Sequence, residues 1–202
     1  IIVFYYVDAY LSEHDWNRGE YYILGLFGVL GMMIMVSAAS LLTLYLGLEL
    51  LSLSLYALIA MQRKSVLASE AAMKYFIMGA IASGLLLYGI SIIYGVTGTI
   101  DLQEINQFVQ NEQYDSILLM FALIFVISAL AFKFGVAPFH MWVPDVYHGA
   151  PTAIVLFIST APKIAAFAMF VRILGDGFLS IVDDWQTVLI VLAIISIALG
   201  NI

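Results

Sequence analysis

The sequence contains no cysteine, and charged residues make up only 10% of its 202 positions. The absence of cysteine excludes disulfides, thiolate metal sites and cysteine-ligated iron–sulfur clusters from this chain. Soluble domains carry about 25% charged residues, so the low charge and the 64% hydrophobic content indicate a membrane protein. The formal net charge of −7 excludes a basic nucleic-acid-binding surface, and we expect no nucleic-acid partner.

Long apolar runs, separated by polar connectors, fill most of the chain. About 20 helical residues cross the hydrocarbon core of a bilayer, so runs of this length predict spanning helices. The chain begins and ends inside apolar runs, and we expect it to be part of a longer protein. The expected spans are the end of one at Ile1–Tyr6, then Tyr21–Ser37, Ser40–Met61, Ala68–Val96, Ser116–Phe132 with an interrupted continuation to Gly149, Thr152–Leu174, and a last one from Trp185. The connectors are Asp8–Glu20, Gln62–Ser65, Thr97–Asp115 and Gly175–Asp184. Residues 1–202 are therefore predicted to form a single all-α, multi-pass membrane domain embedded in the lipid bilayer.

The distribution of Lys and Arg predicts an orientation. Arg18, Arg63 and Lys64 fall in two connectors that alternation of the spans places on the same side. The connector Thr97–Asp115 contains four acidic residues and no Lys or Arg, and alternation places it on the opposite side. By the positive-inside rule the first two connectors are cytoplasmic, with Arg172 as an exception near the far side.

Three charged residues, Glu49, Lys133 and Lys163, lie near the middle of predicted spans. A charge at the bilayer centre costs about 2.5–3.5 kcal/mol on insertion scales, so such residues face the interior of a bundle or water. A structural Glu–Lys ion pair would explain two of them and leave one lysine over. A path for protons would use all three, because burial disfavours the charged form of an amine and a nearby carboxylate favours it.

Hydroxyl groups accompany two of these charges at helical spacing. They are Tyr45, Ser52 and Tyr56 around Glu49, and Thr152, Ser159 and Thr160 before Lys163. Side chains at this spacing share one face of a helix. Such hydroxyls either hold water along a proton path or bind neighbouring helices together.

Two further titratable groups lie closer to the ends of spans. Glu70 and Lys74 are four residues apart with the acid first, which is the favourable order for a helical ion pair. Lys74 is therefore either a structural partner of Glu70 or part of a proton path. Histidine as a residue type can exchange a proton near neutral pH, so His140 is either a proton relay or a plain hydrogen-bond donor.

The stretch FKFGVAPFHMWVPDVYHGAP (132–151) predicts an interrupted helix. Pro138 lacks a backbone N–H and clashes with the carbonyl of Phe134, so the helix should end just after Lys133. Pro144 can begin a second, short helix. Broken helices at membrane depth are tolerated where protein or water satisfies their backbone, and in transporters they lie on the ion path. A kink that serves only packing is the alternative.

Four segments carry a likeness to a known family. They are LGLELLSLSLYAL (46–58), EAAMKYFIMGAIASGLLLYG (70–89), FKFGVAPFHMWVPDVYHGAPT (132–152) and TAPKIAAFAMFVRIL (160–174). In this order they resemble the antiporter-like membrane subunits of proton-translocating NADH–quinone oxidoreductase (respiratory complex I), most closely the subunit N family. The likeness covers nearly all of residues 20–202.

The resemblance implies a fold of two inverted five-helix repeats, each with a broken helix. Residues 21–174 would form the first repeat, and the chain would cover roughly helices three to nine. The resemblance also implies proton-translocating roles for Glu49, Lys133, Lys163, Lys74 and His140. Pro162, directly before Lys163, departs from the family pattern and puts the geometry of that helix in question.

The implied activity is proton pumping driven by electron transfer in partner chains. The assembly would use NADH, FMN, iron–sulfur clusters and ubiquinone, with no cofactor or metal in this chain. Its partners would be the other membrane subunits of complex I, including further antiporter-like ones, in a bacterial inner membrane. An Mrp-type cation/proton antiporter without a redox partner is one alternative, and a passive scaffold with static ion pairs is another.

Overall fold

The computed structural model describes residues 2–13, 19–62, 64–111 and 116–201. Over these ranges it contains helices and no β-strand, and an isolated bridge joins Ser40 to Asp101. The helices are α1 (Ile2–Glu13), α2 (Gly19–Ser37), α3 (Leu41–Ile59), α4 (Val66–Thr97), α5 (Leu102–Asn111), α6 (Ser116–Phe134), α7 (Trp142–Gly149), α8 (Thr152–Ser159), α9 (Ala161–Phe170) and α10 (Val182–Gly200), with a π-helical segment η1 (Val171–Gly177) and a 3-10 segment η2 (Leu179–Ile181). In the described residues, six segments are long and apolar enough to cross a membrane. The predicted all-α, multi-pass bundle is thus confirmed.

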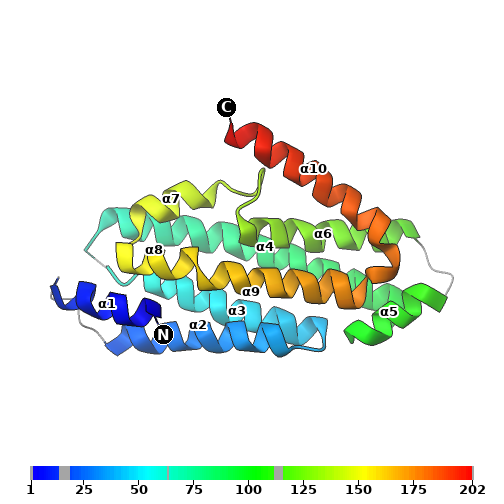
Figure 1. Cartoon of the computed structure of the whole chain (residues 1–202), viewed down its shortest axis with the longest axis horizontal. Helices are drawn as coiled ribbons and strands as arrows, with labels where there is room; N and C mark the ends of the chain where they lie inside the picture. The colour runs from blue at the N-terminus through cyan, green and yellow to red at the C-terminus, as the bar shows by residue number, and fades with distance from the viewer. Residues whose placement is uncertain (1, 14–18, 63, 112–115, 202) are drawn as a thin grey trace.

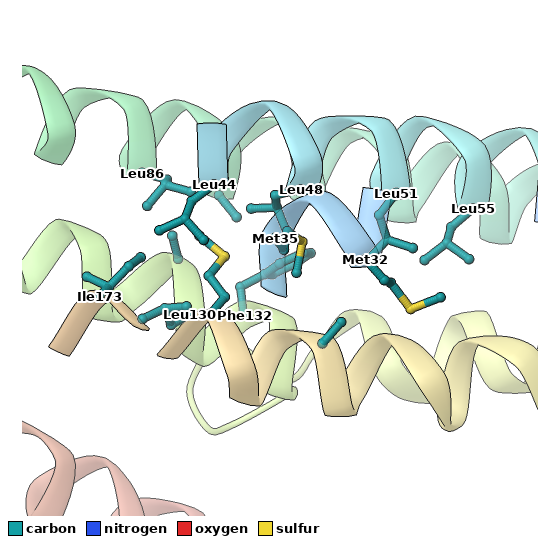
Figure 2. Close-up of a cluster of buried hydrophobic side chains, with 14 of the residues drawn as sticks. Met32, Met35, Leu44, Leu48, Leu51, Leu55, Leu86, Leu130, Phe132 and Ile173 are labelled. Atoms are coloured by element: carbon teal, nitrogen blue, oxygen red, sulfur yellow. The ribbon is translucent and has the colours of Figure 1, made fainter. Parts of the chain in front are cut away.

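The long helices α2, α3, α4 and α6 run side by side, and α8 and α9 continue end to end along them (Figure 1). Glycines allow α2 and α3 to approach closely, because a Cβ on Gly31 would lie 2.6 Å from the carbonyl oxygen of Gly47. Small residues at such a contact let helix backbones pack tightly in a membrane. The core between these helices is apolar (Figure 2). Its labelled side chains are Met32, Met35, Leu44, Leu48, Leu51, Leu55, Leu86, Leu130, Phe132 and Ile173.

Serine residues begin two of the central helices. The Ser40 hydroxyl accepts a hydrogen bond from the backbone N–H of Thr43 at 3.2 Å, and the Ser65 hydroxyl accepts one from Ala68 at 3.2 Å. These caps satisfy donors that have no partner inside the helix. At its other end α4 stops at Gly98, which adopts a left-handed conformation with φ 72°.

Two of the expected connectors are largely helical, contrary to the prediction. In Asp8–Glu20, α1 continues to Glu13 and α2 begins at Gly19. In Gly175–Asp184, the helical segments η1 and η2 connect α9 to α10. The polar residues in these segments favour loops, although polar side chains are also compatible with helix at a membrane surface. Arg18 and Arg63 lie outside the described residues, so the orientation stays a prediction.

The connector Thr97–Asp115 also contains a helix, α5, which the sequence reading missed. Its apolar residues Leu102, Ile105 and Val109 are buried, whereas the rest of the helix is mostly polar. The Asp101 carboxylate accepts from the backbone N–H of Gln103 at 2.9 Å and caps its start. Backbone hydrogen bonds from Leu41 to Ile100 and from Leu102 to Ala39 join this segment to the turn between α2 and α3.

The expected single span Thr152–Leu174 is interrupted at Thr160, which has φ −113° and ψ −90°. Pro162 is the cause, because it has no N–H to donate to Ile158 and its ring excludes a continuous helix. The hydroxyl of Thr160 donates to the carbonyl of Leu156 at 2.8 Å and that of Ser159 donates to the same carbonyl at 3.3 Å. These hydroxyls therefore bond the backbone of their own helix.

Candidate functional site

The site is built on the end of α6, where the predicted break occurs. The helix ends at Phe134, and Gly135 takes a left-handed conformation with φ 72°. The N–H of Gly135 donates to Phe132 at 3.0 Å and the N–H of Val136 donates to Ala131 at 2.9 Å. This pair of bonds is the Schellman motif, which satisfies two of the four last carbonyls of a helix.

The remaining carbonyls of α6 face Lys163. Its amine donates to the carbonyl oxygen of Phe134 at 2.6 Å and lies 3.4 Å from that of Lys133. A cation at this position also interacts favourably with the negative end of the helix dipole. The indole N–H of Trp142 donates to Phe132 at 2.9 Å, and the Lys163 amine lies 5.2 Å from the centre of the Trp142 ring. The break is therefore stabilised by two side chains from outside α6.

A cavity of about 20 Å³ lies between the two lysines. This volume is enough for about one water molecule. It is lined by Met35, Leu48, Leu51, Ser52, Leu55, Tyr75, Lys133, Trp142, Ile158, Pro162, Lys163 and Ala166. Lys133 and Lys163 thus share a small chamber inside the bundle, at the interruption of both of their helices.

Glu49 and Lys133 do not form a direct ion pair in this structure. The amine of Lys133 donates to the hydroxyl of Ser52 at 2.8 Å. The hydroxyl of Ser83, on α4, donates to a carboxylate oxygen of Glu49. Both serines are buried. The structural Glu–Lys ion pair that would explain two of the buried charges is therefore not formed between Glu49 and Lys133. Each of the two bonds to a serine hydroxyl instead, because the α3–α4 contact places Ser83 opposite the carboxylate.

Lys74 is bound at one end of the bundle. Its amine lies 2.8 Å from a carboxylate oxygen of Glu70, as the spacing predicted, and 3.1 Å from one of Asp145 on α7. All three side chains are partly exposed to a similar degree. The bridge to Asp145 joins the second half of the broken helix to α4, and the sequence reading did not find it.

His140 lies in the turn between α6 and α7. Its Nδ1 is buried without a hydrogen-bond partner among the described residues. It does not line the chamber between Lys133 and Lys163. The structure thus brings together Lys133 and Lys163, holds Glu49 near them on α3, and places Lys74 and His140 elsewhere.

Several contributors to the site were missed from sequence. Trp142 and Ser83 reach their partners from segments 10 and 34 residues away, and spacing along the chain gives no signal of such contacts. Among the described residues, no group of three or more His, Cys, Asp or Glu side chains is placed to hold a metal ion.

Known proteins with similar sequence and structure fit this architecture. A family model described as NADH:quinone oxidoreductase/Mrp antiporter, transmembrane, matches residues 38–202. NADH-quinone oxidoreductase subunit N of Thioalkalivibrio sulfidiphilus is 60% identical over 202 residues, which is 100% of this chain and 42% of that protein. The chain therefore spans less than half the length of this curated relative.

Two solved assemblies contain chains with a similar fold. One chain of respiratory complex I from Thermus thermophilus with bound aureothin has a TM-score of 0.68 and 42% identity, covering 77% of this chain and 34% of that one. A chain of the Mrp complex from Dietzia sp. DQ12-45-1b has a TM-score of 0.68 and 27% identity, covering 77% of this chain and 29% of that one. With its helices, its interrupted α6 and the match over residues 38–202, the chain belongs to the NADH:quinone oxidoreductase/Mrp antiporter transmembrane family.

Proposed function

We propose that this chain is part of a proton-translocating membrane subunit of an NADH:quinone oxidoreductase. The observation that carries the proposal is the chamber between Lys133 and Lys163, where two interrupted helices meet around a water-sized space. Two amines at membrane depth are costly, and a shared water-sized space between them gives the amines a use in proton transfer. The 60% identity to a subunit N supports the redox-linked assembly.

The proposed chemistry moves a proton between amines. Lys133, as an ammonium, releases a proton toward the chamber, and Lys163, as an amine, accepts it directly or through one water molecule. The carboxylate of Glu49 favours the charged form of Lys133 when it approaches and disfavours proton release. Because the three groups interact, a change in the charge of one changes the free energy of charging the others.

Lys74 and His140 take supporting roles in the proposal. Lys74, with Glu70 and Asp145, lies two helical turns from the start of α4, on the side that the positive-inside rule assigns to the cytoplasm. We assign this cluster to proton uptake. The Nδ1 of His140 is buried without a hydrogen-bond partner among the described residues, and we assign His140 to a proton relay outside the chamber.

The redox chemistry belongs, in this proposal, to partner chains of the assembly. NADH, FMN, iron–sulfur clusters and ubiquinone are assigned to those chains, and this chain binds other membrane subunits, including further antiporter-like ones. Its location is the bacterial inner membrane, as the bacterial source of the relative suggests. Residues 21–174 are proposed as the first of two inverted five-helix repeats.

The test is Lys133→Ala in the full-length subunit within the assembled complex. Quinone reduction by NADH and proton uptake into inverted membrane vesicles are measured, with the exposed Lys64→Ala as the matched control. The proposal expects proton uptake to fall at least tenfold in the first variant and to stay unchanged in the control. Wild-type rates of both processes in Lys133→Ala complexes would refute it.

A cation/proton antiporter of the Mrp type is a second candidate. The TM-score of 0.68 to a chain of the Mrp complex supports it as a related family, because that fold likeness equals the one to the complex I chain, although the sequence identity of 27% is lower than 42%. In this case vesicles would exchange sodium for protons without NADH oxidation. Purification of the full-length protein with NADH dehydrogenase activity decides for the oxidoreductase, and sodium-dependent proton release without that activity decides for the antiporter.

A further inference from the structure

Two buried serines form hydrogen bonds with charged groups that the proposed function requires. Ser52 is 1% exposed and Ser83 is 6% exposed. The hydroxyl of Ser52 donates to the carbonyl of Leu48 at 2.7 Å, so its oxygen is free only to accept, and it accepts from the amine of Lys133. The hydroxyl of Ser83 donates to Glu49. The Ser52 hydroxyl therefore accepts a hydrogen bond from the amine, and the Ser83 hydroxyl donates one to the carboxylate.

These hydrogen bonds give the Lys133 amine and the Glu49 carboxylate different partners. Ser52 is three residues after Glu49 on α3, so it shares a helical face with the carboxylate. Ser83 approaches the same carboxylate from α4. The Glu49 carboxylate bonds to Ser83 on α4 and the Lys133 amine bonds to Ser52, so the two groups can form a direct ion pair only if at least one of them shifts from the position in which its serine bond holds it.

We propose that Ser52 and Ser83 are positioning residues that hold Lys133 and Glu49 apart in one state of the transport cycle. The inference rests on the proposed function and adds the structural state that competes with the Glu49–Lys133 ion pair. Each serine stabilises the separated state through one hydrogen bond to a charged group. Losing such a bond shifts an equilibrium by about tenfold or more. Removal of either hydroxyl therefore traps the ion pair and slows proton transfer.

Alanine variants test the proposal with a control on the same helix. Ser54 is also buried, at 5% exposure, and donates to the carbonyl of Leu50 at 2.7 Å. Within the described residues its hydroxyl bonds no charged group. Ser52→Ala, Ser83→Ala and Ser54→Ala are made in the full-length subunit of the assembled complex. Proton uptake into inverted vesicles is measured per assembled complex, together with quinone reduction.

The expected result is about a tenfold loss of proton uptake in Ser52→Ala and Ser83→Ala, and wild-type uptake in Ser54→Ala. Ser52→Thr and Ser83→Thr keep a hydroxyl and should recover most of the rate, which a mere packing role would not allow. Equal rates in all three alanine variants, or threonine variants as slow as the alanine ones, would overturn the proposal. Lys133→Ala distinguishes the proposed function from the positioning role of the serines. If Lys133→Ala abolishes proton uptake while the serine variants keep the wild-type rate, the positioning role is refuted and the proposed function stands.

Discussion

Replacement of Lys163 by Met separates a transport role from a structural one. The substitution removes the hydrogen bonds to Phe134 and Lys133, and a hydrogen bond to a charged group contributes about 1.5–3 kcal/mol. It also removes a charge whose insertion costs about 2.5–3.5 kcal/mol. The two changes oppose each other and are of similar size. The contact with Lys133, at 3.4 Å, is too long to add much, so the net change in the free energy of unfolding should lie between about 0.5 kcal/mol toward lower stability and about 2 kcal/mol toward greater stability.

The assay compares thermal unfolding of the detergent-solubilised complex with proton uptake in vesicles. Lys163→Met should unfold close to or above the wild-type temperature and lose proton uptake at least tenfold. Ile164→Met, at the next and well exposed position, is the matched control and should change neither quantity. A midpoint that falls in step with activity would refute this reasoning, because it would make Lys163 a structural cap of α6 and favour the passive scaffold.

Two further predictions concern packing around the site. Trp142→Phe removes the indole donor to Phe132 and part of a buried ring, and should lower the free energy of unfolding in a denaturant titration by roughly 1–2 kcal/mol. Gly79→Ala should destabilise by roughly 1–3 kcal/mol, because its Cβ would lie 1.9 Å from the Tyr56 hydroxyl. Gly84→Ala, on the same helix with open space around the Cβ position, is the control and should be neutral or stabilising. Equal effects of the two glycine variants would contradict the assignment of the clash.

The break in α6 could be predicted because its causes are local. Pro138 lacks an N–H, and the helix ends four residues before it, just after Lys133, as expected. The charges at membrane depth were also predictable, since they stand out against an apolar sequence. The spacing of Leu102, Ile105 and Val109, which are buried in α5, is typical of a helix with one apolar face. The polar residues between them favour a loop, so the sequence alone did not predict this helix.

The partners of the charges could not be predicted from sequence. The contact of Lys163 with Phe134 spans 29 residues, and that of Ser83 with Glu49 spans 34. Such contacts depend on which helix faces share an interface, and helices that are apolar all round give little signal of their orientation. The attraction of opposite charges makes an ion pair between Glu49 and Lys133 one reading of the sequence, whereas in the structure each of the two bonds to a serine hydroxyl.

Pro162 explains the position of Lys163 in the structure. Because Pro162 starts a new helix, Lys163 lies in the first turn of α9, where the positive end of the helix dipole repels a cation. The last carbonyls of α6 attract the same cation from the opposite direction. The amine therefore lies between two helix ends of opposite sign, and a small displacement of either helix changes how well its charge is stabilised. In a passive ion-pair network such balance would have no purpose, whereas a group that must bind and release a proton in each cycle requires it.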